Sequence, residues 1–305
     1  MSHPRLAVRI AAALAAATTA AHAAVTPLAV DCRGARTAAP TVILSAGAFG
    51  TSADWDYVLD DLAPGGRACA FDRAGLGGSL PRDGAPDALA KAAELGDLLD
   101  QLGETAPVIL VGHSNGALYA ETFAKLHPER VAGLVAVDGV GAAALESPLL
   151  LADLRQENQA AALAVTLGRL GLGGLAAHGM ADQMGLRPEA AARKYHGLVC
   201  QTCLMTARDE DRLMAVGLSQ SQALGPLNHR IPVVVINGDT APAARLSQAW
   251  RTAEVALAAG ADRSWILDMP GATHTSPLTR DRAYVAAAVN WLRSLTPLPD
   301  ADVGH

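Results

Sequence analysis

The chain alternates short aliphatic runs with segments in which apolar residues recur every three or four positions. The runs predict strands at residues 27–30, 41–44, 68–71, 107–111, 131–137, 231–236 and 264–267. Helical spacing between them predicts amphipathic helices, including one from about Trp55, one over 85–102 and one over 281–295. Strands that alternate with helices favour an α/β fold with a mostly parallel central sheet.

The rhythm changes between Gly139 and about Arg230. Leucine-rich helical stretches replace the alternating strands and helices there, and the strand pattern resumes at Ile231. We expect this insertion to form a helical cap over the sheet edge where the strands end. The predicted organisation is a signal peptide (1–23), a first core part (24–138), a cap (139–229), a second core part (230–297) and a tail (298–305).

The N-terminal segment has the pattern of a secretory signal peptide. Arg5 and Arg9 precede an apolar stretch at 10–21, and residues 21–23 (Ala-His-Ala) form a small-residue cleavage pattern. The apolar stretch is too short to span a bilayer, and no later run is long enough. We therefore expect a periplasmic or secreted protein without stable membrane insertion.

The charge of the chain excludes some partners. The formal net charge is −6, and removal of Arg5 and Arg9 with the signal peptide makes it −8. A negative surface argues against nucleic acid and anionic membranes as partners. The sequence carries no signal for an oligomeric state.

Four cysteines in an exported protein predict disulfides. Cys32 follows one predicted strand and Cys69 lies in another, so a Cys32–Cys69 bridge would tie down the N-terminal strand. Cys200 and Cys203 form a Cys-x-x-Cys pair that is compatible with a local disulfide, a redox pair or half of a metal site. A local disulfide is favoured, because no redox-type βαβ context and no second pair with zinc spacing are present.

The candidate chemistry centres on residues 112–116, Gly-His-Ser-Asn-Gly. An aliphatic run precedes this Gly-x-Ser-x-Gly pattern and a helical pattern follows it, so Ser114 is expected on a sharp strand-to-helix turn. Side chains at Gly112 and Gly116 would collide with the neighbouring elements. Such a turn exposes the Ser114 hydroxyl as a nucleophile.

Two backbone N–H groups are candidates for stabilising an oxyanion. The Asn115 N–H begins the helix after the serine, and the glycine-bearing loop at 45–50 would supply a second donor, for which we select Ala48. The loop after residues 68–71 contains Asp72 and Arg73, which we interpret as a structural ion pair that braces that loop.

A serine hydroxyl needs a base to take its proton. His274 follows the last predicted strand and therefore lies at the same sheet edge as Ser114. His113 adjoins the serine, but its side chain is expected to point away from the Ser114 hydroxyl.

These motifs resemble the α/β-hydrolase family, in its serine-nucleophile branch with a helical cap. The resemblance rests on the Ala-Gly loop at 46–47, the Asp-Arg-Ala-Gly-Leu-Gly motif at 72–77, the Gly-His-Ser elbow and the cap, and it covers nearly all of the chain after residue 23. It implies that Ser114 is the nucleophile and His274 the base, and it supports Asn115 and Ala48 as oxyanion donors.

The triad acid departs from the usual family pattern. Most members carry it three residues beyond the glycine after the seventh strand, but that position is Ala241 here. Asp239 is one residue beyond Gly238, and Asp138 ends the sixth strand of the family's numbering. Asp138 is the first candidate and Asp239 the second; either would accept the N–H of His274.

The predicted function is a serine hydrolase that cleaves a carboxylic ester or lactone, a small-molecule acyl substrate, without a cofactor. A serine at the elbow argues against the dehalogenase and epoxide-hydrolase branches, which place Asp there. One alternative is an aminopeptidase of the same fold, in which Glu146, Glu157 or Asp182 would bind the substrate amine. The other is a catalytically silent binding module.

Overall fold

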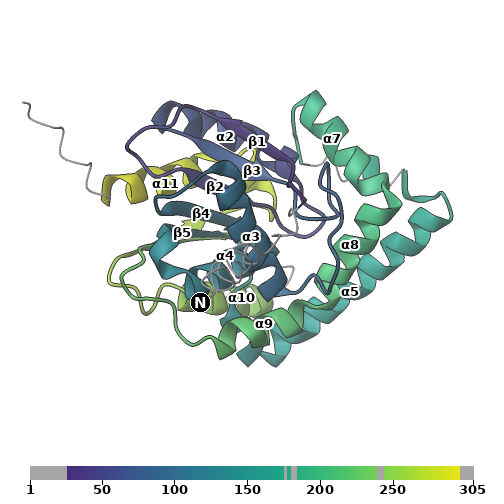
Figure 1. Ribbon diagram of the computed structural model, residues 1–305. Helices are drawn as coiled ribbons and strands as arrows, with labels where there is room; N and C mark the ends of the chain where they lie inside the picture. The colour runs from purple at the N-terminus through teal and green to yellow at the C-terminus, as the bar shows by residue number, and fades with distance from the viewer. Residues whose placement is uncertain (1–25, 175–176, 180–183, 239–243, 296–305) are drawn as a thin grey trace, which may run out of the picture.

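The computed structural model describes residues 26–174, 177–179, 184–238 and 244–295. The predicted signal peptide, Asp182, Asp239, Ala241 and the predicted tail lie outside the described residues. Figure 1 shows a central sheet with helices on both faces and a further group of helices to one side.

The sheet has seven described strands in the order β1-β3-β2-β4-β5-β6-β7. Only β1 is antiparallel to its neighbour; the other pairs are parallel. The strands are β1 Val30–Arg33, β2 Val42–Ser45, β3 Ala68–Phe71, β4 Val108–His113, β5 Val131–Val137, β6 Val233–Gly238 and β7 Ser264–Met269. The predicted α/β fold with a mostly parallel sheet is confirmed.

Two apolar cores cover the two faces of the sheet, because successive strand residues point to opposite sides. Val42 and Leu44 pack with helices α2 (Asp56–Leu62) and α11 (Ala283–Leu295). Ile43 packs on the other face with α3 (Ala88–Leu102) and α4 (Asn115–Leu126). Helix α10 (Ala244–Ala256) packs on β6.

The described connections also contain short 3-10 helices. These are η1 Ser52–Trp55, η2 Ala63–Gly65, η3 Pro128–Arg130, η4 Ala142–Glu146 and η5 Ser276–Leu278.

Four described helices lie between β5 and β6: α5 Pro148–Arg169, α7 Pro188–Val199, α8 Gln201–Arg212 and α9 Met214–Ala223. We call these the cap helices. Strand β5 is the sixth strand of the family's numbering, so they occupy the predicted place. Helices α5, α7 and α8 form the group to one side of the sheet in Figure 1. The predicted domain limits stay predictions.

The structure corrects two details of the predicted helices. Helix α3 begins at Ala88 rather than 85, because the Asp87 side chain accepts the Ala90 N–H and caps the helix. Leu89, near the start of this helix, is exposed. The C-terminal helix begins at Ala283, two residues later than predicted.

Both predicted disulfides are present. Cys32 lies directly opposite Cys69 in the β1–β3 register, and their sulfurs are bonded. Cys200 and Cys203 are bonded at the start of α8. The first bridge fastens the edge strand β1 to β3, and the second closes the corner between α7 and α8.

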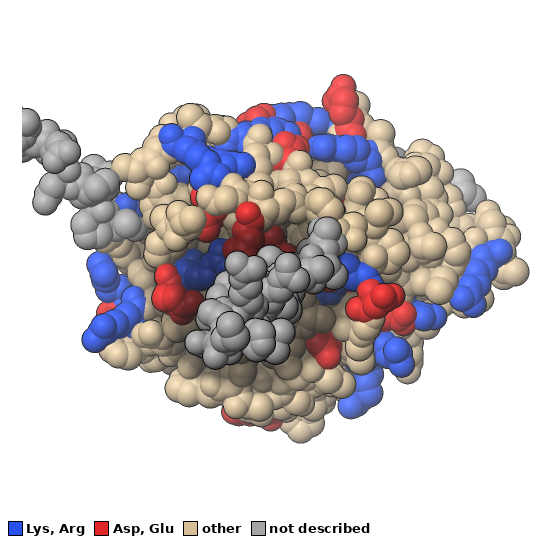
Figure 2. All heavy atoms as spheres, viewed as in Figure 1, with Lys and Arg blue, Asp and Glu red and all other residues tan. Residues whose placement is uncertain are grey.

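The surface shows no single-sign patch on the face in Figure 2, where acidic and basic side chains are intermixed. Among the described residues, none of the helices combines the length and the apolar character that a membrane span requires.

Candidate active site

Ser114 lies on the predicted strand-to-helix turn, between β4 and α4. Its φ is 52° and its ψ is −125°, a backbone conformation that L residues rarely adopt. A Cβ at Gly112 would lie 2.4 Å from the Gly116 carbonyl oxygen, and a Cβ at Gly116 would lie 2.4 Å from the Ser45 carbonyl oxygen. Both glycines are therefore required for the close approach of α4 to β2 and β4.

Three residues near this turn have positive φ angles. Among the described non-glycine residues they occur at Phe49, Ser114 and Asp138, with values of 55°, 52° and 42°. The three residues follow β2, β4 and β5, whose carboxyl ends meet at one edge of the sheet. Backbone strain of this kind persists only where surrounding contacts enforce it, and it concentrates at functional sites.

Asp138 contacts His274. The Asp138 Oδ2 atom lies 2.5 Å from His274 Nδ1, and Asp138 Oδ1 accepts the Gly238 N–H at 2.9 Å. The carboxylate is thus held by the backbone of β6 on one side and faces the imidazole on the other. Asp239, the second candidate, lies outside the described residues.

This contact shifts both pKa values. Burial opposes the charge on each group, but the hydrogen bond and opposite charge prevail. The pKa of His274 is raised from 6.5, and the pKa of Asp138 is lowered from 3.8. The pair therefore favours an ionised carboxylate that stabilises an imidazolium, as a triad requires.

The His113 side chain contacts the loop that carries His274. Its Nε2 lies 2.7 Å from the His274 carbonyl oxygen, which accepts the hydrogen bond. Burial and the nearby His274 lower the pKa of His113 to about 3, so the ring is neutral at physiological pH. This hydrogen bond between the end of β4 and the loop after β7 was not predicted from the sequence.

The loop after β2 packs directly on the serine. A Cβ at Gly47 would lie 2.8 Å from Ser114 Cβ and 3.3 Å from Ser114 Oγ. Ala48 lines the same cavity as Ser114 and His274. Ala48, predicted as the second donor, thus lies in the same cavity as Ser114, and Asn115 is the first residue of α4.

The predicted ion pair between Asp72 and Arg73 is wrong. Asp72 instead accepts the backbone N–H groups of Ser52 and Gly78, at 2.6 and 2.8 Å. Arg73 is fully buried and pairs with Glu210 of the cap helix α8, at 2.7 Å. No local pattern predicted this pair, because its partners are 137 residues apart.

A cavity of about 530 Å³ lies between the sheet edge and the cap. Most of the cap residues that line it are aliphatic: Ala160, Ala161, Leu163, Ala164, Leu167, Leu198 and Leu204. Two carboxyl groups of the cap, Glu157 and Asp211, also line it, as does the ion pair of Asp54 with Lys194. The cavity therefore suits a largely apolar molecule with a polar group.

The two carboxyl groups have unusual pKa values. Burial, together with the charge of Glu210, raises the pKa of Asp211 to about 7, although Asp211 accepts a hydrogen bond of 2.9 Å from the Asn115 side chain. Burial and Asp153 raise the pKa of Glu157. Asp211 was not predicted from the sequence. Glu146 lines a different cavity, against the expectation for the aminopeptidase alternative.

In the described part of the chain, no group of three or more His, Cys, Asp or Glu side chains is arranged to hold a metal ion. Cys200 and Cys203 are bonded to each other, so they do not form half of a metal site here.

A model of the alpha/beta hydrolase family matches residues 42–288, so the chain belongs to this family. The fold and the family together define a hydrolase of the α/β class.

Solved structures with the same fold include several hydrolases. A thermophilic esterase from Thermogutta terrifontis is 23% identical, with a TM-score of 0.63 over 88% of this chain and 93% of that one. An enol-lactonase from Burkholderia xenovorans LB400 is 20% identical, with a TM-score of 0.62 over 88% and 96% of the two chains. At these identities the likeness shows the fold alone.

One curated relative is matched over a shorter stretch. The probable transporter efuK of Hormonema carpetanum is 34% identical over 103 residues, which are 32% of this chain. This chain covers only 15% of that protein's length.

Proposed function

We propose that this protein is a serine hydrolase that cleaves a carboxylic ester or lactone through an acyl-enzyme on Ser114. The observation that carries the proposal is the convergence of three groups at one sheet edge. Ser114 lies on a strained turn, it lines one cavity with His274, and His274 Nδ1 lies 2.5 Å from Asp138. The esterase and the enol-lactonase among the structural neighbours fit this substrate class.

In the proposed reaction, Ser114 Oγ attacks the acyl carbon while His274 Nε2 takes its proton. Asp138 accepts the Nδ1–H bond and stabilises the imidazolium. The N–H groups of Asn115 and Ala48 stabilise the oxyanion. The imidazolium then protonates the leaving alkoxide, and the alcohol departs. Water attacks the acyl-enzyme through the same steps and releases the acid.

We also propose that the protein is exported to the periplasm or the medium. Two disulfides fit an oxidising compartment, and the N-terminal 23 residues have a signal-peptide pattern. The expected partner is a small acyl substrate, not nucleic acid.

A serine-directed fluorophosphonate probe tests the proposal. We expect the purified protein to be labelled at Ser114 and a panel of short-chain esters and lactones to reveal hydrolysis. Ser114→Ala removes only the Oγ, so it should abolish both signals without changing the unfolding temperature. Hydrolysis by Ser114→Ala within about tenfold of wild type would overturn the mechanism. Absence of labelling in the folded wild type would favour the silent binding module.

Glu157 supports a second candidate function, that of an aminopeptidase, because its carboxyl group lines the same cavity as Ser114. An aminopeptidase would hydrolyse aminoacyl amides, and Glu157→Gln would raise its KM for them while leaving neutral esters unaffected. Hydrolysis of esters without any turnover of aminoacyl amides would exclude this alternative.

A further inference from the structure

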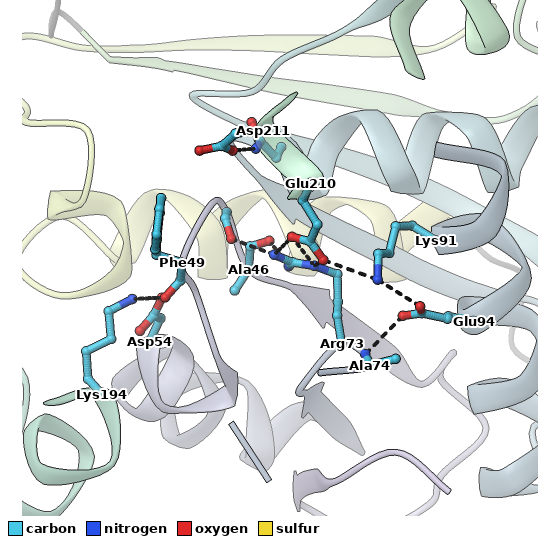
Figure 3. A network of polar contacts seen from close by, with 12 residues as sticks. Ala46, Phe49, Asp54, Arg73, Ala74, Lys91, Glu94, Lys194, Glu210 and Asp211 are labelled. Atoms are coloured by element: carbon cyan, nitrogen blue, oxygen red, sulfur yellow. Dashed lines mark hydrogen bonds and ion pairs between the residues drawn. The ribbon is translucent and has the colours of Figure 1, made fainter. Parts of the chain in front are cut away.

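The loop of residues 46–50, which carries Ala48, is held by two cations through its backbone carbonyl groups. Arg73 donates to the Ala46 carbonyl oxygen and, at 2.9 Å, to the Gly47 carbonyl oxygen. Lys194 donates to the Phe49 carbonyl oxygen at 3.0 Å. Figure 3 shows the two cations approaching this loop from different elements.

Two hydrogen bonds to the Gly47 carbonyl oxygen set the direction of the Ala48 N–H, one from Arg73 and one from the Gly50 N–H of the same turn at 3.1 Å. The Gly47 carbonyl and the Ala48 N–H belong to one planar trans peptide group, so they point in opposite directions. Arg73 lies on the carbonyl side, and Ala48 lines the cavity of Ser114. A rotation of this peptide group would break the Arg73 bond and turn the N–H away from the developing oxyanion.

The cap helix α8 in turn holds Arg73. Glu210 accepts from both Nε and Nη2 of the guanidinium, at 3.1 and 2.7 Å, and both side chains are almost fully buried. Lys91 Nζ lies 3.2 Å from the Glu210 Oε1 atom. A planar guanidinium bound on two edges keeps one orientation, and the edge that contacts Ala46 and Gly47 is thereby fixed.

The cap helix α7 holds the other end of the loop. Lys194 forms a buried ion pair of 2.9 Å with Asp54 while it donates to the Phe49 carbonyl oxygen. Phe49 has a φ of 55°, which is unfavourable for an aromatic residue, so this turn needs external contacts to persist. Lys194 provides one of them from 145 residues away.

We propose that Arg73, Glu210 and Lys194 are positioning residues that set the direction of the Ala48 N–H, so that the cap completes the oxyanion site. The inference rests on the proposed function, because it assigns a role in the hydrolysis at Ser114. It extends the role of the cap from shaping the cavity to orienting a group that acts in the transition state.

Two variants and one control test the proposal. Glu210→Gln keeps the shape of the side chain and removes the charge that holds Arg73. The double variant Lys194→Met with Asp54→Asn removes the bond to Phe49 without leaving a buried charge unpaired. The control Arg187→Gln breaks the ion pairs of Arg187, which precedes α7, with Asp56 and Asp60 of α2. These pairs do not involve the loop of residues 46–50. All proteins are assayed at one temperature, about 20 °C below the lowest unfolding temperature in the set.

Both test variants should lower kcat by about tenfold to a hundredfold with KM within threefold of wild type. Loss of a whole oxyanion donor costs roughly 10²–10³ in kcat, and a misdirected donor should cost less. Inhibition by a trifluoromethyl ketone, whose adduct with Ser114 carries an oxyanion, should weaken by the same factor. Arg187→Gln should keep the wild-type kcat and inhibition.

Three results would overturn the inference. In the first, the folded double variant keeps kcat within threefold of wild type. If Glu210→Gln does not fold, the double variant by itself tests the inference. In the second, KM rises while kcat and ketone inhibition are unchanged. In the third, Arg187→Gln loses as much kcat as the test variants. Wild-type labelling at Ser114 separates these results from failure of the proposed function, since an unlabelled wild type would overturn both.

Discussion

At the scale of single residues, the site depends on the geometry of side chains that the chain brings together from far apart. Asp138 and His274 are 136 residues apart, yet their side chains meet at 2.5 Å. The positive φ of Asp138 and its bond to the Gly238 N–H hold the carboxylate in place. Exchange of this carboxylate is therefore the most direct probe of the triad.

Asp138→Asn should lower kcat by on the order of 10⁴, because the amide favours the wrong tautomer of His274 and leaves the imidazolium unsupported. Steady-state kinetics on an activated ester would measure the loss. The matched variant is Asp239→Asn, which should cost roughly tenfold or less if that residue is structural. The reverse order of the two effects would transfer the role of the acid to Asp239.

The pH dependence follows from the raised pKa of His274. A base must be neutral to take the serine proton, so activity falls as the pH drops below this pKa. The acid limb of kcat/KM should therefore lie above 6.5, the ordinary value for histidine. In Asp138→Asn the residual activity should show this limb at lower pH, since the raising contacts are lost. An acid limb at the same pH in both proteins would contradict the Asp138–His274 contact.

At the scale of elements, local patterns were predictable and long-range pairs were not. The strands and the glycines at 112 and 116 follow from short runs and a motif within five residues. The Arg73–Glu210 pair spans 137 positions and the Lys194–Asp54 pair spans 140, and only the packing of the cap on the core creates them. By position Asp138 was the first candidate for the acid and Asp239 the second, because each follows one of two adjacent strands. The contact of Asp138 with His274 could not be predicted from that position.

The junction of β2, β4 and α4 has no room for a side chain at Gly116. Gly116→Ala should reduce the free energy of unfolding by about 1–3 kcal/mol or more, because its Cβ would lie 2.4 Å from a backbone oxygen that cannot easily move. Denaturant unfolding would measure this. Gly260→Ala is the control, since no atom lies within 4 Å of its Cβ position and its φ is ordinary. An equal effect of the two substitutions would contradict the packing described.

At the scale of the whole molecule, covalent bridges secure the periphery. Cys32–Cys69 fastens the edge strand β1, and Cys200–Cys203 closes a corner of the cap. The cysteines of the first bridge are separated by 37 positions and those of the second by 3. A longer closed loop restricts the unfolded chain more, so the two bridges should differ in their contribution to stability.

Replacement of Cys32 and Cys69 by serine should lower the free energy of unfolding by about 3–4 kcal/mol on the loop-entropy model. Replacement of Cys200 and Cys203 by serine should cost clearly less. Guanidinium titrations of the two double variants and the oxidised wild type would measure both. A smaller loss for the first pair than for the second would show that strand β1 is held by its other contacts.

The position of the cap within the chain also has a consequence for synthesis. Ser114 and Asp138 precede the cap, and His274 follows it, 136 residues after Asp138. At 5–20 residues per second, roughly 8–30 seconds would pass between the synthesis of Ser114 and that of His274. On the proposed mechanism, the nascent chain and any fragment truncated before β7 lack the base, so their Ser114 hydroxyl is not activated. Hydrolysis would then require the segment after β7 that carries His274.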